Sequence, residues 1–234
     1  MSKQRKLFLF ICFIIIDLLL VSGILLLRDV TLKNILSNEV NALGDLNFFK
    51  DDYSYSIKSR GNYAVIEEAI KDYLSNYATL VQKVANASNG VELSGLLLTS
   101  SIESDGPLFE QTLKYLDEYQ VEFNQDMDEV FYYLDDNLSI DNYITQYTDN
   151  QEVIELYQEL ITKNHFSEKL ENSKQQLVIE RIDTNSYIDS VRAVIMFLKD
   201  NSNNYTISNG QVTFNDSNLL NEYVKLKDKT KRIY

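Results

Sequence analysis

The chain has a single cysteine, and that cysteine lies in an apolar segment near the N-terminus. Cys12 falls within residues 7–27, so the rest of the chain has no thiol from which to form a disulfide. Domains without disulfides are held by their own core packing. We therefore expect residues 28–234 to fold around a hydrophobic core without covalent cross-links.

Residues that interrupt helices are also scarce. The chain contains one proline and seven glycines, whereas 16 tyrosines and 11 phenylalanines supply large side chains for a core. A sandwich or barrel needs many short turns, and proline and glycine are the usual residues of such turns. The composition therefore favours long helices.

The side chains of common catalytic and metal sites are missing as well. His165 is the one histidine, and no cysteine lies outside residues 7–27, so neither a Cys/His zinc site nor a Cys–His nucleophile pair is expected. Phosphate-binding loops, dinucleotide fingerprints, serine nucleophile elbows and HExxH are absent. We predict a protein that is not an enzyme and has no cofactor; acid–base catalysis by paired carboxylates is the weaker alternative.

Basic residues are outnumbered by acidic ones. Lys and Arg together number 22 and Asp and Glu 35, which gives a net charge of −13. Nucleic-acid binding needs a basic surface that neutralises phosphates. We therefore predict no nucleic-acid partner.

The longest apolar stretch covers residues 7–27 and follows bases at positions 3, 5 and 6. As a helix it would extend about 30 Å, the thickness of a bilayer's hydrocarbon core. The flanking charges place the N-terminus in the cytoplasm. The segment predicts a single-pass cell-membrane protein, in contact with membrane lipid, with an extracytoplasmic C-terminal domain. A cleaved signal peptide is the alternative, disfavoured because the apolar run continues past Ser22 and Gly23.

Asp17 is the one charged residue within this run. A carboxylate near the middle of a bilayer costs about 3 kcal/mol. We interpret Asp17 as a candidate intramembrane contact with another membrane protein or with a second copy of this chain. The alternative is a protonated side chain that its apolar neighbours outweigh.

Apolar residues recur at steps of three and four through most of the remaining chain, which predicts amphipathic helices. The predicted fold is all-α, with an N-terminal transmembrane helix, an extracytoplasmic four-helix-bundle-like domain and a small C-terminal β-hairpin. The predicted parts are a cytoplasmic N-terminus (1–6), a transmembrane helix (7–27), a juxtamembrane helix and connector (28–61), a helical bundle (62–204), and a hairpin with a terminal helix packed on the bundle (205–234).

Two motifs predict helix boundaries. Asp105 and the following Gly-Pro predict a helix start, because aspartate caps free amides and proline is tolerated in a first turn. A second helix is expected over residues 139–163, with a break near Asp149 and Asn150.

The segment 205–214 changes to alternating apolar and polar residues around Asn209 and Gly210. An Asn-Gly pair in this context is the strongest short-range signal for a type I′ hairpin. In the predicted register, Tyr205 faces Phe214 and Ile207 faces Val212.

Acidic residues accumulate between Lys114 and Lys163, where the chain has no Lys or Arg. On the predicted helix, Glu118, Glu122, Asp126 and Glu129 share one face, where like charges repel each other. A solvated face and a surface for a basic protein partner are both compatible with this pattern. The glycine and closing glutamate of a calcium loop are missing, so no metal site is predicted. We treat these four acids as a candidate partner face.

Taken together, the sequence predicts a membrane-anchored helical envelope protein that acts as a structural or partner-binding module. The alternative is a sensory ectodomain that binds a small ligand between its helices and signals through a membrane partner.

Overall fold

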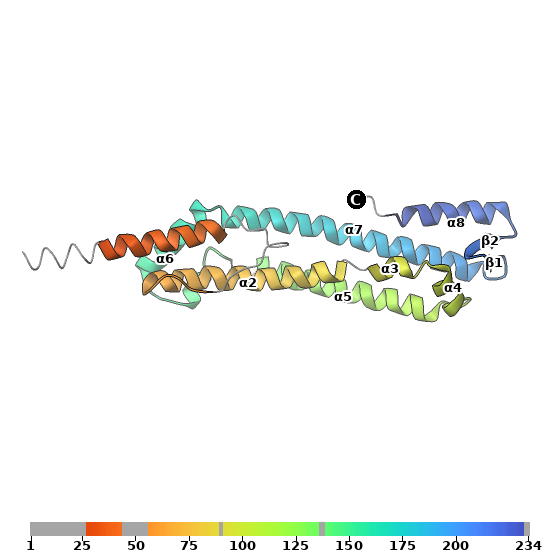
Figure 1. Ribbon diagram of the computed structural model, residues 1–234, viewed down its shortest axis with the longest axis horizontal. Helices are drawn as coiled ribbons and strands as arrows, with labels where there is room; N and C mark the ends of the chain where they lie inside the picture. The colour runs from red at the N-terminus through yellow and green to blue at the C-terminus, as the bar shows by residue number, and fades with distance from the viewer. Residues whose placement is uncertain (1–26, 44–55, 89–90, 136–138, 232–234) are drawn as a thin grey trace, which may run out of the picture. The chain divides into compact units, whose positions relative to one another are not determined.

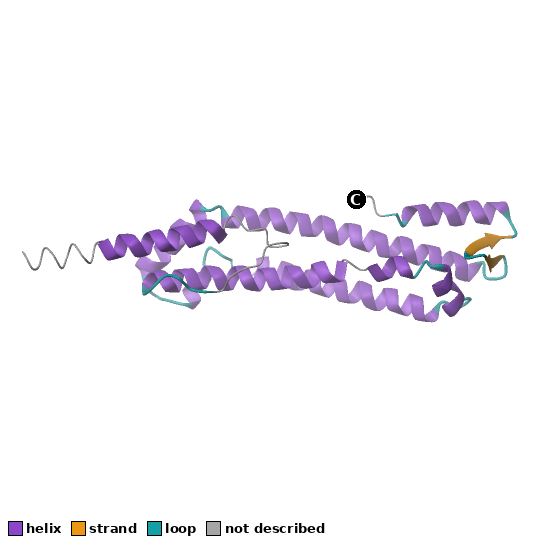
Figure 2. Ribbon diagram, in the orientation of Figure 1, coloured by secondary structure: helices purple, strands orange, loops and turns teal. Residues whose placement is uncertain are grey.

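The computed structural model describes residues 27–43, 56–88, 91–135 and 139–231. These residues are mostly helical, with one antiparallel hairpin near the C-terminus (Figures 1 and 2). Helix 27–43 comes first. The later elements are α2 (Asn62–Ser88), α3 (Val91–Gly95), α4 (Thr99–Asp105), α5 (Glu110–Asp135), the short 3-10 helix η1 (Tyr143–Gln146), α6 (Gln151–Lys163), α7 (Phe166–Asp200), β1 (Tyr205–Ser208), β2 (Gln211–Phe214) and α8 (Ser217–Lys229). A mostly helical fold with a small C-terminal hairpin is thereby confirmed.

The predicted membrane location needs correction. No helix within the described ranges is both long and apolar enough to cross a bilayer. Residues 7–26 of the predicted span, including Asp17, lie outside the described residues. The prediction of a single-pass cell-membrane protein with an extracytoplasmic domain is corrected accordingly: the structure shows no single-pass anchor within the residues it describes.

The chain divides into two compact units. The first combines Met1–Asn76 with Asn137–Glu168, and the second combines Tyr77–Asp136 with Lys169–Tyr234. In the first unit, helix 27–43, the start of α2, η1 and α6 all contribute buried apolar side chains. Each such side chain contributes roughly 1.5–3 kcal/mol on burial.

In the second unit, one face of α7 supplies both apolar clusters. Ile188 and Val191 pack with side chains that include Leu93 and Leu116. Further along, Val194, Ile195 and Leu198 pack with Ile102, Phe109 and Tyr223. Because these α7 residues are spaced three or four apart, they lie on one side of the helix. The opposite side of α7 is left outside this core.

The predicted hairpin is confirmed, including its register. Tyr205 pairs with Phe214 and Ile207 with Val212. The turn residues Asn209 and Gly210 have φ values of 53° and 72°, the left-handed conformation that a type I′ turn requires at both positions. The half-buried apolar side of the hairpin packs on the cluster around Val194 and Leu198, as a two-stranded hairpin needs for stability.

The start of α5 differs from the prediction. Asp105 ends α4, and α5 begins only at Glu110. Phe109 has φ 51°, which is incompatible with a continuous right-handed helix. The Asp105 carboxylate still caps α5, because it accepts hydrogen bonds from the backbone N–H groups of Gln111 (3.3 Å) and Thr112 (2.7 Å). The expected cap is therefore present, but it acts across a loop.

The segment 139–163 is α-helical only in its second half. η1 forms a single 3-10 turn, and α6 begins at Gln151. The side chain of Asn150 accepts a hydrogen bond of 3.0 Å from the N–H of Glu152, which is standard capping geometry. The expected break near Asp149 and Asn150 is thus the start of α6.

We predict that Gly210→Ala destabilises the folded chain by about 1 kcal/mol, because alanine is strained at positive φ. Gly95→Ala is the matched control. An added Cβ meets nothing within 4 Å at either position. Of these two glycines, Gly210 has a left-handed φ and Gly95 does not. Urea unfolding of both variants measures the difference; equal midpoints would contradict this account of the turn.

Candidate functional site

The four acids predicted as a partner face all lie on α5, but they occupy different environments. Asp126 is only 5% exposed, and its Oδ1 lies 2.7 Å from the Nζ of Lys83 on α2. Glu129 Oε2 lies 3.0 Å from the same nitrogen. The hydrogen bonds that the Lys83 ammonium donates to Asp126 and, second, to Glu129 raise the pKa of Lys83. These two acids therefore tie α5 to α2.

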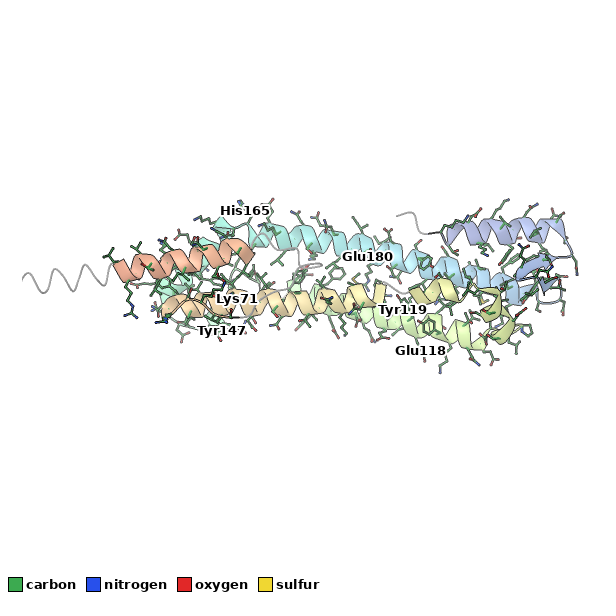
Figure 3. The ribbon with its side chains drawn as sticks, in the orientation of Figure 1. Lys71, Glu118, Tyr119, Tyr147, His165 and Glu180 are labelled. Atoms are coloured by element: carbon green, nitrogen blue, oxygen red, sulfur yellow. The ribbon has the colours of Figure 1, made fainter. Side chains whose placement is uncertain are left out.

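Glu118 and Glu122 point to solvent. Glu118, labelled in Figure 3, is 67% exposed, and its Oε1 lies 3.6 Å from the Nζ of Lys114 one turn earlier. Glu122 is exposed and forms no ion pair within the described residues. Of the four predicted acids, Glu118, Glu122 and Glu129 therefore lie at the surface, and Asp126 does not.

The outward ridge of α5 also carries two large exposed side chains. Val121 is 57% exposed and Tyr132 is 69% exposed. They are 11 residues apart, close to three helical turns, so they lie on the same side of α5. Exposed aromatic and aliphatic groups bordered by charges are the usual composition of a contact surface.

Polar pairs join α5 to α7 within the second unit. The Asn185 amide donates to Asn124 Oδ1 at 3.1 Å, and Arg181 Nη1 donates to Asp128 Oδ1 at 2.7 Å. Further along, Arg192 Nη2 donates to Asp117 Oδ1 at 2.8 Å. The order of these contacts shows that α5 and α7 run antiparallel. It also shows that the acids on this side of α5 are already paired.

A buried ion pair lies within the first unit. Glu67 and Lys71, one turn apart on α2, are 0% and 1% exposed. Lys71 Nζ donates to Glu67 Oε1 at 2.6 Å, to the carbonyl of Ser56 at 2.7 Å and to Glu39 Oε2 at 3.2 Å. All three ammonium protons therefore have acceptors. Figure 3 places Lys71 on the side of α2 that faces helix 27–43.

The Glu67 carboxylate is equally well satisfied. It accepts hydrogen bonds from the backbone N–H of Lys58 at 3.0 Å and of Ser59 at 2.7 Å, besides the one from Lys71. Burial acts to raise the pKa of Glu67, but these hydrogen bonds, led by that of Lys71, outweigh it and hold the pKa below its usual value. This network fixes segment 56–59 and helix 27–43 on α2.

A second polar cluster in the first unit centres on Asp72. Its Oδ2 accepts hydrogen bonds from the hydroxyls of Tyr143 at 2.6 Å and Tyr147 at 2.8 Å. Burial, together with these bonds to a carboxylate, raises the pKa of both phenols. The tyrosines are therefore neutral donors that attach η1 to α2, and the cluster has a structural role.

Sequence reasoning missed Glu67 and Lys71. A Glu and a Lys four residues apart usually form an exposed pair on a helix. The available signal was their position directly beside the apolar stripe of Ile66, Ile70 and Leu74. Spacing alone did not show that segment 56–59 would cover them.

No group of three or more His, Cys, Asp or Glu side chains is arranged to hold a metal ion within the described part of the chain. His165 lies exposed at the junction of α6 and α7, with Nδ1 3.4 Å from Glu168.

Comparison with models of known protein families, with curated proteins and with solved structures finds no match. Function is therefore inferred from the geometry of the chain itself.

We predict that Lys71→Met destabilises the folded chain by about 3–5 kcal/mol, because it leaves the Glu67 carboxylate buried without its counter-ion. Lys58→Met is the matched control. Lys58 also contacts Glu39, but its side chain is 56% exposed, so its loss should cost far less stability than the loss of Lys71. Chemical unfolding measures both; similar losses would contradict the assigned role of burial.

The lowered pKa of Glu67 also predicts a pH dependence. In the unfolded chain a glutamate titrates near pH 4.3. A folded pKa below that value means that stability is fully present above about pH 5 and is lost as the pH falls through the folded pKa. The unfolding free energy of Glu67→Gln should therefore fall less steeply below pH 5 than that of the wild type. Parallel curves would contradict the predicted linkage.

Proposed function

We propose that this chain is a non-enzymatic helical-bundle protein whose outward α5 face binds a basic segment of a protein partner. The supporting observation is the exposure of Val121 (57%) and Tyr132 (69%) on a ridge bordered by acids. Tyrosine side chains contribute strongly to binding where they become buried between partners. A partner with apolar and basic residues would complement this ridge.

The charges around the ridge support a basic partner. Asp117 and Asp128 lie on the flank towards α7, where Arg192 and Arg181 pair with them. The other flank carries Glu118 and Glu122, which point to solvent. Opposite charge accelerates association and disfavours wrong partners. Glu118 pairs there with the exposed Lys114 of its own helix at 3.6 Å, a solvated pair that an incoming Lys or Arg can replace, so such a residue would meet this flank first.

The sensory alternative requires a ligand site enclosed between helices. A groove of about 640 Å³ lies between α7 and α8, a volume within the range of small-molecule sites. It is open at the surface, and its lining mixes serines, charged residues and a few apolar side chains. Such a groove suits a side-chain ridge of another protein better than an enclosed small ligand, so partner binding is the function we propose.

We predict that reversing the charge of the outer flank weakens binding. A photo-crosslinking residue at Val121 should capture, in the cells of origin, a partner whose crosslinked segment is rich in Lys and Arg. Glu118→Lys with Glu122→Lys should weaken that capture at least about tenfold, close to 1.4 kcal/mol. Crosslink yield, identified by mass spectrometry, is the measurement.

The matched control for this experiment is Glu155→Lys with Glu159→Lys. These two acids are exposed and four residues apart on α6, so the charge change and the spacing are the same on a different helix. Capture should persist in the control. Equal loss in both double variants, or the absence of any captured partner, would contradict the proposed function.

A further inference from the structure

α8 is the one helix of the described residues in which bases outnumber acids. It carries Lys225, Lys227 and Lys229 against Glu222 and Asp228, whereas α5 carries eight acids and one base. Both helices belong to the second unit (Figure 1). In a chain of net charge −13, α8 therefore supplies a basic surface that the other described helices lack.

One exposed side of α8 combines apolar and basic side chains. Leu220 is 38% and Val224 47% exposed, and Lys227 follows at steps of four and three residues, which keeps the three on one side of the helix. Lys231 continues this spacing just past the helix end, where its N–H still bonds to the carbonyl of Asp228 at 3.3 Å. These four side chains, from Leu220 to Lys231, form the α8 stripe. The helix dipole favours bases near a C-terminus, but it does not explain two exposed apolar side chains in line with them.

The lysines of the α8 stripe are not tied to a second helix within the described ranges. Lys227 lies over the ring of Tyr223, one turn earlier on α8, at 5.9 Å from the ring centre. Lys231 pairs with Asp228 at 2.7 Å, and these two side chains are 76% and 59% exposed. Solvated local pairs contribute little free energy. Both ammonium groups can therefore meet a carboxylate of another molecule.

The α5 ridge offers the opposite composition. It is formed by Glu118, Val121, Glu122 and Tyr132, and all four side chains are exposed. The side chains of the α8 stripe are exposed as well, so the two surfaces do not cover each other within one copy. A contact between the ridge and the stripe must therefore join two copies.

The charged residues of the two surfaces have the same spacing. Glu118 and Glu122 are four residues apart on α5, and Lys227 and Lys231 are four residues apart at the end of α8. Two helices lying side by side can thus form two carboxylate–ammonium pairs one turn apart. The pair that Glu118 makes with Lys114 of its own helix is exposed and 3.6 Å long, so an incoming lysine can replace it.

The apolar residues select the direction of the contact. In an antiparallel contact with Glu122 beside Lys227, Leu220 lies about 10 Å further along the two helices, and Tyr132 about 15 Å further in the same direction. Helical side chains lean towards the N-terminus of their own helix, so Leu220 and Tyr132 lean towards each other. A parallel contact with the same two acids and lysines would direct Leu220 to the start of α5, near Gln111, away from Tyr132.

We propose that the α8 stripe of one copy binds the α5 ridge of a second copy, with the two helices antiparallel. Glu118 then meets Lys231, and Glu122 meets Lys227. The inference rests on the proposed function, because it names the basic segment that the ridge binds. Each copy has one ridge and one stripe on different surfaces, so the contact is head-to-tail and can continue from copy to copy.

The first test locates the contact by photo-crosslinking. The full chain is purified in a mild detergent that keeps the apolar residues 7–27 dispersed, and unlabelled chain is mixed with isotope-labelled chain. A photo-crosslinking residue at Val121 should join residues 225–231 of the other isotopic form, and one at Tyr132 should join residues 217–220. A crosslinker at Leu98, which is 60% exposed outside both surfaces, should not reach α8. Absence of crosslinks between copies to α8, or exchange of the two captured segments, would overturn the proposal.

The second test exchanges charges between copies. Lys227→Glu with Lys231→Glu should weaken self-association at least about tenfold in sedimentation equilibrium, and so should Glu118→Lys with Glu122→Lys. An equimolar mixture of the two double variants should regain the wild-type association, because each acidic stripe then meets a basic ridge. Circular dichroism checks that each variant is folded.

The matched control is Lys225→Glu with Lys229→Glu. It makes the same charge change, with the same spacing, on a different side of α8, so association should persist. A monomeric wild type, a mixture that does not associate, or equal loss in the control would overturn the contact between ridge and stripe.

The outcomes separate this inference from the proposed function. If the purified chain does not associate but a crosslinker at Val121 still captures a different basic protein in the cells of origin, the inference fails and the proposed function stands. If that capture yields this chain through residues 225–231, both stand. If neither experiment yields a captured segment, both fail.

Discussion

Two ionised groups without access to water constrain the first unit. The carboxylate of Glu67 and the ammonium of Lys71 are both fully buried, and an ion in that position is tolerable only when every lone pair and proton has a partner. The partners come from outside α2: the N–H groups of Lys58 and Ser59, and the carboxylate of Glu39. Segment 56–59 and helix 27–43 must therefore stay in place if the pair is to remain charged. If the pair stayed buried without the hydrogen bonds of these two elements, its desolvation would have no compensation.

The second unit distributes its charges differently. Most of its core is apolar, and Lys83, Arg181 and Arg192 each hold α5 to a neighbouring helix through an ion pair. The pairs with exposed acids contribute little free energy individually, whereas Asp126 is buried against Lys83. These pairs also orient α5, because they use the acids on its inner flanks, while on the outer flank Glu118 pairs with Lys114 of the same helix. Much of the acidity of this region is thus structural, and only a small part is available to a partner.

The local elements were largely predictable from the sequence. The Asn209-Gly210 turn requires a backbone conformation that few other residue pairs adopt easily, so the hairpin and its register followed from the residues alone. The start of α5 was not predictable in the same way, because Phe109 takes a left-handed conformation and Asp105 caps the helix from beyond the loop. The candidate face shows the same limit. Helical spacing groups Asp126 with Glu118, but only the packing of α2 shows that Asp126 is buried against Lys83.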